Sequence, residues 1–172
     1  RLNDTMHIEH DDVTVASGGG VDAIYLYGNG AQVEINADGG TKVLYGYGQS
    51  TVLQLGQGLH ADHARLLMVK NEVGSPYYDP SAEDVRRLLL LNEDGSQYVD
   101  RRDGYSSLQL PSAIQELRYA DGAVLSFEQL LDRGVDVLGG AQKDYLYGTT
   151  VNDRVQLGAG NDIVYAYGGD DH

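Results

Sequence analysis

The chain has 172 residues, a formal net charge of −14 at pH 7, and 23 glycines but no cysteine. An acidic surface repels phosphate groups, so nucleic acids and anionic membranes are excluded as expected partners. The absence of cysteine rules out disulfides, thiolate nucleophiles and cysteine-based zinc sites. No apolar run reaches the roughly 18 residues that span a bilayer, and the length suffices for one domain with its own core.

A row of aliphatic residues runs through the N-terminal third at intervals of nine: Leu26, Ile35, Leu44 and Leu53. A nine-residue repeat with glycine-rich turns predicts a parallel β-roll, in which each repeat supplies one turn and one short strand. The aliphatic residue points inwards, and two repeats complete one coil, so residues 18 apart stack on the same sheet. We therefore expect residues 1–60 to form the N-terminal half of a roll.

The residue after each aliphatic position alternates between an aromatic ring and an amide. In order along the chain, these residues are Tyr27, Asn36, Tyr45, Gln54, Tyr147, Gln156 and Tyr165. The alternation predicts one sheet with stacked tyrosines on its outer face, and the four tyrosines are candidate ligand-binding residues. Two interpretations are open: the middle of the chain covers this face, as large apolar patches usually are covered, or the face binds a peptide terminus or sugar ring.

Residues 61–134 have a different composition, with few glycines, all three prolines and long aliphatic runs. Alternating and aliphatic patterns predict strands, and Asp-Gly pairs predict hairpin turns. We expect strands at Arg65–Val69 and Arg87–Asn92, a turn at Asp94-Gly95 leading into Ser96–Asp100, a hairpin of Ile114–Tyr119 and Val124–Phe127 around Asp121-Gly122, and a short helical turn at Glu128–Asp132. The segment is interpreted as a small β-rich lobe inserted into the roll.

Residues 135–172 carry four aspartates in strict phase: Asp144, Asp153, Asp162 and Asp171 stand nine residues apart. Ca²⁺ binds carboxylate and backbone carbonyl oxygens, and glycine lets a carbonyl approach closely. Turns 18 residues apart would sandwich each ion, so Asp144 pairs with Asp162 and Asp153 with Asp171. The candidate ligands of several structural calcium ions are Asp144, Asp153, Asp162, Asp171, Gly140, Gln142, Gly158, Gly160, Gly169 and, in the N-terminal half, Asp22.

The two halves align without a gap when residues 39–60 are laid over residues 141–162. The aliphatic row is kept, but Lys42, Thr51 and His60 stand at the acid positions. The N-terminal half is therefore interpreted as roll that has lost most of its metal ligands. The Lys42 ammonium is expected to place a cation where Ca²⁺ would otherwise sit.

These residues resemble the RTX (repeats-in-toxin, haemolysin-type calcium-binding) family over roughly residues 11–60 and 135–172. The stretch Ile114–Leu125 resembles the haemolysin-type calcium-binding-related domain, a similarity that extends over Glu83–Leu131. The resemblances imply an all-β protein, a parallel β-roll (RTX solenoid) split by an inserted β-rich lobe with a short helical turn. They also imply an extracellular location, secreted or attached to the cell surface, as in large adhesins and toxins exported by type I secretion.

The expected function is calcium-triggered folding outside the cell as a structural, secretion-assisting domain. The alternatives are a peptide- or glycan-recognition module of an adhesin, or the secretion tail of an enzyme whose catalytic part lies elsewhere. No nucleophile elbow or paired carboxylates with a pocket emerge, so no enzyme activity is expected. The histidines of His7–Asp12 and His60–His63 are read either as zinc ligands or as solvated loop residues. Because the chain ends in mid-repeat at His172, we expect a monomeric fragment of a longer chain.

Overall fold

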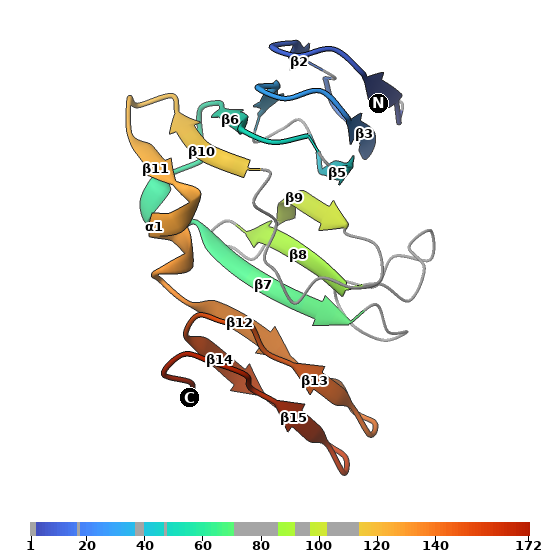
Figure 1. The fold of residues 1–172 in the computed structure, drawn as a ribbon, viewed down its shortest axis with the longest axis vertical. Helices are drawn as coiled ribbons and strands as arrows, with labels where there is room; N and C mark the ends of the chain where they lie inside the picture. Colours follow the sequence, from blue (N-terminus) through green and yellow to red (C-terminus); the bar gives the residue numbers. More distant parts are fainter. Residues whose placement is uncertain are drawn as a thin grey trace.

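The computed structural model describes residues 3–16, 18–36, 40–46, 48–70, 86–91, 97–102 and 114–172. The protein is mostly β, a parallel β-solenoid of about six turns with one short helix. The predicted all-β roll is thereby confirmed. Figure 1 shows the two ends of the chain at opposite ends of the solenoid. Within the described ranges, no helix has the length and apolar character needed to cross a membrane.

The N-terminal half alternates between two sheets, as a nine-residue repeat predicts. One sheet receives β1 (Thr5–Ile8), β3 (Asp22–Leu26) and β5 (Lys42–Gly46), and the other receives β2 (Thr14–Ala16), β4 (Gln32–Ile35) and β6 (Thr51–Leu55). All neighbouring pairs among these strands are parallel. Each strand is therefore half a coil away from the next, and its inward side chains face those of the opposite sheet.

The predicted stacking of Leu26 on Leu44 is wrong by two residues. Ile24 lies opposite Leu44 in the parallel register, and Leu26 lies opposite Gly46. The first coils repeat every 18 residues, but the strand pairs β3–β5 and β4–β6 are offset by 20. Ile24 and Leu26 are both fully buried, since each strand points two aliphatic residues inwards. Either residue fits the inward row, so the sequence alone cannot distinguish the two registers.

The strands and hairpin predicted for the middle of the chain are confirmed. The structure has β7 (Arg65–Lys70), β8 (Arg86–Leu91), β9 (Gln97–Arg102), β10 (Ile114–Tyr119) and β11 (Val124–Ser126), with a 3₁₀ turn η1 (Ala61–His63) before them. The pairs β7–β8, β8–β9 and β10–β11 are antiparallel. The turn expected at Asp94-Gly95 lies outside the described residues. The expected helical turn is α1 (Phe127–Leu131), which begins with a capping box formed by Ser126 and Gln129.

These middle strands extend both sheets of the roll. β9 pairs in parallel with β5, β7 pairs in parallel with β12 (Val135–Leu138), and β10 pairs in parallel with β6. The resulting eight-stranded sheet has the order β1-β3-β5-β9-β8-β7-β12-β14, where β14 is Asp153–Gln156. The five-stranded sheet has the order β11-β10-β6-β4-β2, and β13 (Tyr145–Tyr147) pairs with β15 (Ile163–Tyr165) separately.

One hydrophobic core joins the two halves of the roll to the middle segment. Buried side chains from all three parts belong to a single cluster that includes Ile24, Leu44, Leu53, Leu66, Leu117, Val137 and Leu146. α1 contributes Phe127 and Leu130 to the same cluster. The C-terminal strands that carry the aspartates therefore rest on a core that starts at the opposite end of the chain.

Candidate calcium-binding site

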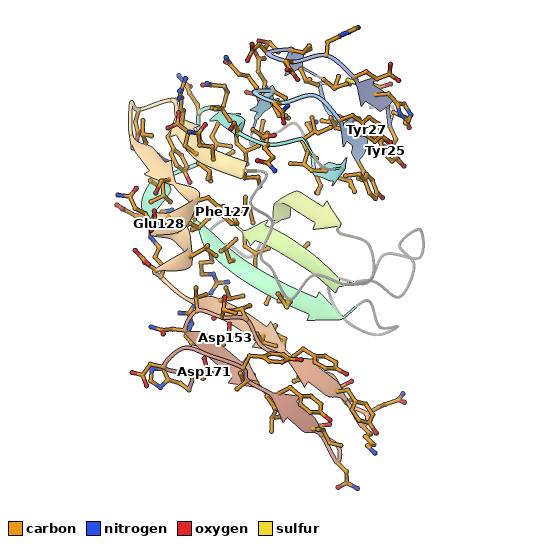
Figure 2. The ribbon with its side chains drawn as sticks, viewed as in Figure 1. Tyr25, Tyr27, Phe127, Glu128, Asp153 and Asp171 are labelled. Atoms are coloured by element: carbon orange, nitrogen blue, oxygen red, sulfur yellow. The ribbon has the colours of Figure 1, made fainter. Side chains whose placement is uncertain are left out.

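The first candidate pair lies on β14 and on the turn 18 residues later. Asp153 is completely buried, and its backbone N–H donates a hydrogen bond to Asp171 Oδ1 at 3.0 Å. The Asp153 carboxylate accepts two bonds from Thr149, one from the backbone N–H at 2.5 Å and one from Oγ1 at 2.9 Å. Figure 2 shows Asp153 and Asp171 close together at the C-terminal end of the solenoid. The structure thus brings together the pair that the spacing predicts.

The second candidate pair repeats this geometry directly before β13 and β15. The backbone N–H of Asp144 donates to Asp162 Oδ1 at 3.0 Å, and Asp144 Oδ2 accepts from the Gly140 N–H at 2.5 Å. Asp144 is buried and Asp162 is half-buried. In both pairs the backbone N–H of one aspartate therefore binds the carboxylate of the aspartate one coil later, in a partly dehydrated place.

Backbone carbonyls surround the turns that carry these acids. A Cβ added to Gly158 would lie 2.0 Å from the Gly140 carbonyl oxygen, and one added to Gly160 would lie 2.6 Å from the Gln142 carbonyl oxygen. Both glycines have positive φ, +81° and +137°. Gly169 approaches the Val151 carbonyl oxygen in the same way, with a Cβ distance of 2.4 Å. Only glycine fits such a close approach, so the turns stack carbonyl oxygens beside the carboxylates.

This donor set fits Ca²⁺, a hard cation that takes six to eight oxygen ligands. Within the part of the chain that the structure describes, no three His, Cys, Asp or Glu side chains gather around one point. An ion therefore needs backbone carbonyls in addition to the stacked pair of carboxylates. The residues that would hold it are the Asp144–Asp162 pair with the carbonyls of turns 139–143 and 157–161, and the Asp153–Asp171 pair with those of turns 148–152 and 166–170.

The electrostatics of Asp153 also favour a cation. Burial raises the pKa of its carboxyl, the two hydrogen bonds from Thr149 oppose this, and the nearby Asp171 carboxylate raises the pKa further. A divalent ion between Asp153 and Asp171 would compensate for both causes of the upward shift. Thr149 was not predicted from the sequence. It stands four residues before Asp153, as Gly140 does before Asp144, and this offset could have identified it.

The close approach of the turns gives the first testable prediction. We expect Gly158→Ala to destabilise the calcium-bound form by roughly 1–3 kcal/mol, because its Cβ would overlap the Gly140 carbonyl oxygen at a positive φ. Gly168→Ala is the matched control, because the nearest atom to its Cβ would be 3.9 Å away. Thermal unfolding in excess Ca²⁺ measures both variants, and equal melting temperatures would contradict the stacked-turn geometry.

Asp22, predicted as a calcium ligand, is engaged by a lysine. Lys42 Nζ lies 2.6 Å from Asp22 Oδ2 and 2.5 Å from the Gly18 carbonyl oxygen, and both side chains are buried. Asp22 Oδ1 accepts the Asp4 N–H at 3.0 Å, as Asp162 and Asp171 accept from their partners. The predicted cation at Lys42 is therefore present, and it takes a carboxylate oxygen that an ion would need.

The prediction that one sheet carries all four tyrosines is wrong. Tyr25 and Tyr45 stack in the eight-stranded sheet, with ring centroids 4.7 Å apart, and His7 continues this column at 4.6 Å from Tyr25. Tyr147 and Tyr165 stack at 5.2 Å in the two-stranded sheet. The reason is that the middle segment adds strands to the eight-stranded sheet up to β12, and β13 then starts a sheet of its own.

The middle segment leaves several of these rings exposed. Of the four predicted tyrosines, Tyr27 and Tyr165 are about half exposed, whereas Tyr45 and Tyr147 are partly buried, so the interpretation that the middle segment covers the whole tyrosine face is wrong. Figure 2 shows Tyr25 and Tyr27 at the N-terminal end, distant from Asp153 and Asp171. The His7 ring was not predicted as part of the column; its position 18 residues before Tyr25 is the signal that would have found it.

The remaining histidines do not form a metal site in the described part of the chain. His60 and His63 contact each other edge to face at 5.8 Å, and His60 Nδ1 lies 3.9 Å from Asp121 Oδ2. His60 and Asp121 are both about half exposed to solvent. These contacts fit solvated residues near the start of β7. The aspartate pairs therefore remain the candidate metal site.

Comparison with known proteins places a family description on the same residues. No curated protein and no solved structure matches the chain. RTX calcium-binding nonapeptide repeats typically bind Ca²⁺, and they are typical of extracellular proteins exported by type I secretion. Residues 137–172, which hold both aspartate pairs, match the RTX calcium-binding nonapeptide repeat in four copies.

Proposed function

We propose that this chain is a non-catalytic module that folds on extracellular Ca²⁺ and assists the secretion of a larger exoprotein. The observation that carries the proposal is the two aspartate pairs, buried Asp153 with half-buried Asp171 and buried Asp144 with half-buried Asp162, beside glycine turns that backbone carbonyls approach closely. Stacked carboxylates repel each other in a dehydrated site, and the glycines lose much backbone entropy on folding. Bound Ca²⁺ would offset both, so its binding energy becomes folding energy.

The concentration of free Ca²⁺ is much higher outside the cell than in the cytoplasm, so the module is expected to bind calcium and fold only after export. Extracellular calcium modules bind with dissociation constants of about 10⁻⁴–10⁻³ M, far above the free calcium of a cytoplasm. On this proposal residues 139–172 stay unfolded before export and fold after it. The split arrangement, with the segment around Glu83–Leu131 as a calcium-binding-related domain between two blocks of roll, belongs to the same proposal.

A calcium titration tests the proposal. We expect far-UV circular dichroism to show a gain of β structure on addition of Ca²⁺, with a midpoint between about 0.1 and 1 mM. Hydrogen exchange resolves the location, because protection should appear in β13, β14 and β15. Mg²⁺ is the control, since it demands a rigid octahedral shell that stacked carbonyls do not offer. Identical spectra in EDTA and in excess Ca²⁺ would refute the proposal.

A second candidate function is recognition of a peptide or glycan, as in an adhesin. The exposed rings of Tyr145 and Tyr165, with Tyr147 stacked beside Tyr165, favour it, because half-exposed tyrosines offer both an apolar ring and a hydroxyl. A glycan and peptide array with and without Ca²⁺ distinguishes the two functions. Saturable binding that Tyr147→Ala abolishes would support recognition, whereas a blank array would leave the structural module alone.

A further inference from the structure

The buried Lys42–Asp22 pair stands in the fold where the C-terminal half has an aspartate pair. Asp22 Oδ1 accepts an N–H from the residue 18 positions earlier at 3.0 Å, the same bond that Asp162 and Asp171 make. Gly18, whose carbonyl oxygen contacts Lys42 Nζ, stands four residues before Asp22, as Gly140 stands before Asp144. The two sites are therefore built on the same backbone plan.

The two sites differ in charge by the charge of one calcium ion. Asp144 with Asp162 carries two negative charges, and so does Asp153 with Asp171. In the N-terminal site the next coil brings Lys42 instead of an aspartate, so the buried Asp22–Lys42 pair is neutral, and Asp4, whose N–H binds Asp22, is exposed to solvent. Replacing a carboxylate by an ammonium changes the charge by +2, which is what binding one Ca²⁺ does. The ammonium also contacts one carboxylate oxygen and one carbonyl oxygen, the two kinds of ligand that Ca²⁺ takes.

We propose that Lys42 is a covalently attached replacement for one Ca²⁺, so that the N-terminal half-roll folds without calcium. This inference deepens the proposed function and depends on it for the role of the C-terminal half. Before calcium arrives, strands β1–β6 form a folded template, and the eight-stranded sheet runs from it through β9, β8 and β7 to β12. Calcium-dependent coils then add to an existing sheet edge at β12, where β14 pairs.

Two properties of the N-terminal half support a calcium-independent fold. At two positions that correspond to the aspartates of the C-terminal repeats, the coils of the five-stranded sheet have the uncharged residues Ala31 and Thr51. Both residues are buried. The aliphatic residues of β3 to β6 are almost completely buried, including Ile24, Val33, Leu44 and Leu53. Burial of these side chains drives folding without an ion. By contrast Val155 and Val164 in the C-terminal coils are only partly buried.

Hydrogen exchange of the whole chain in EDTA is the first test. We expect the amides of β3 and β5 to remain at least about tenfold protected over unfolded rates, while those of β13 and β15 exchange freely. Fast exchange in β3 and β5 would overturn the inference. Protection of β13 and β15 equal to that in excess Ca²⁺ would instead refute the proposed function, so the two failures are distinguishable.

Two substitutions of Lys42 test the replacement itself. Lys42→Met keeps the aliphatic stem and removes the charge, so protection of β3 and β5 in EDTA should fall at least about tenfold. Lys42→Asp restores a doubly negative pair, and this variant should lose the same protection in EDTA and regain it in Ca²⁺. Equilibrium dialysis with ⁴⁵Ca²⁺ should count one more bound ion per chain for Lys42→Asp than for the parent protein. An unchanged ion count, or no recovery at any Ca²⁺ concentration, would overturn the inference.

Discussion

Asp153→Asn is expected to raise the calcium midpoint of folding by roughly 10- to 100-fold, the loss typical of weakened metal coordination. Asp153 is fully buried, its N–H is bonded to Asp171, and its carboxylate is oriented by both donors of Thr149. Asparagine keeps the shape of the side chain but contributes no negative charge to the ion. The stack would then hold one carboxylate charge where two are needed to balance Ca²⁺.

The same substitution should have the opposite effect without calcium. Burial and the neighbouring Asp171 both raise the pKa of the Asp153 carboxyl, so the ionised carboxylate is disfavoured in the folded chain when no ion is bound. Neutral asparagine removes that penalty. In EDTA the variant should therefore be at least as stable as the parent, and in saturating Ca²⁺ it should be less stable.

The control for Asp153→Asn is Asp170→Asn. Asp170 is exposed and lies beside Asp171, and its backbone N–H donates to Asn152 Oδ1. Asp170→Asn removes the same negative charge as Asp153→Asn, but Asp170 is not part of the Asp153–Asp171 pair. Urea unfolding at several Ca²⁺ concentrations compares the two variants. A common calcium midpoint for both would show that bulk charge, and not the Asp153–Asp171 pair, controls folding.

Much of the candidate site could be predicted from sequence because its residues obey a short period. Asp144 and Asp162 are 18 positions apart, and one coil of the roll has that length, so their contact follows from the repeat alone. The Lys42 cation was predictable for the same reason, because the two halves align without a gap. The identity of its partner was not, since Asp22 was counted among the calcium ligands.

The errors arose where an insertion changed the period. The two extra residues between β4 and β5 shift Leu26 from Leu44 to Gly46, and buried aliphatics at alternate positions conceal such a shift. The tyrosine prediction failed on a larger scale, because the strands of residues 61–134 decide which sheet receives β12 and therefore where Tyr147 lies. Strand pairings between distant segments are set by tertiary packing, and a local pattern does not contain them.

Leu117→Ala is expected to destabilise the protein by about 2–5 kcal/mol, in EDTA as well as in Ca²⁺. Leu117 is completely buried on β10, where it lies opposite Leu53 of β6 on one side and Leu125 of β11 on the other. Its side chain belongs to the core cluster that also contains residues of the N-terminal coils. Truncation should therefore loosen the N-terminal half-roll as well as the hairpin that carries it.

Hydrogen exchange separates this expectation from a local effect. If the middle strands are an integral part of the solenoid, protection should fall in β4 and β6 as well as in β10 and β11. Leu157→Ala is the control, because Leu157 is 41% exposed and its truncation should change stability by less than about 0.5 kcal/mol. Unchanged protection in β4 and β6 would mean that the hairpin folds as a separate unit. Coupled loss would mean that the calcium-dependent end grows on one continuous core, from β1 through the middle strands to β14.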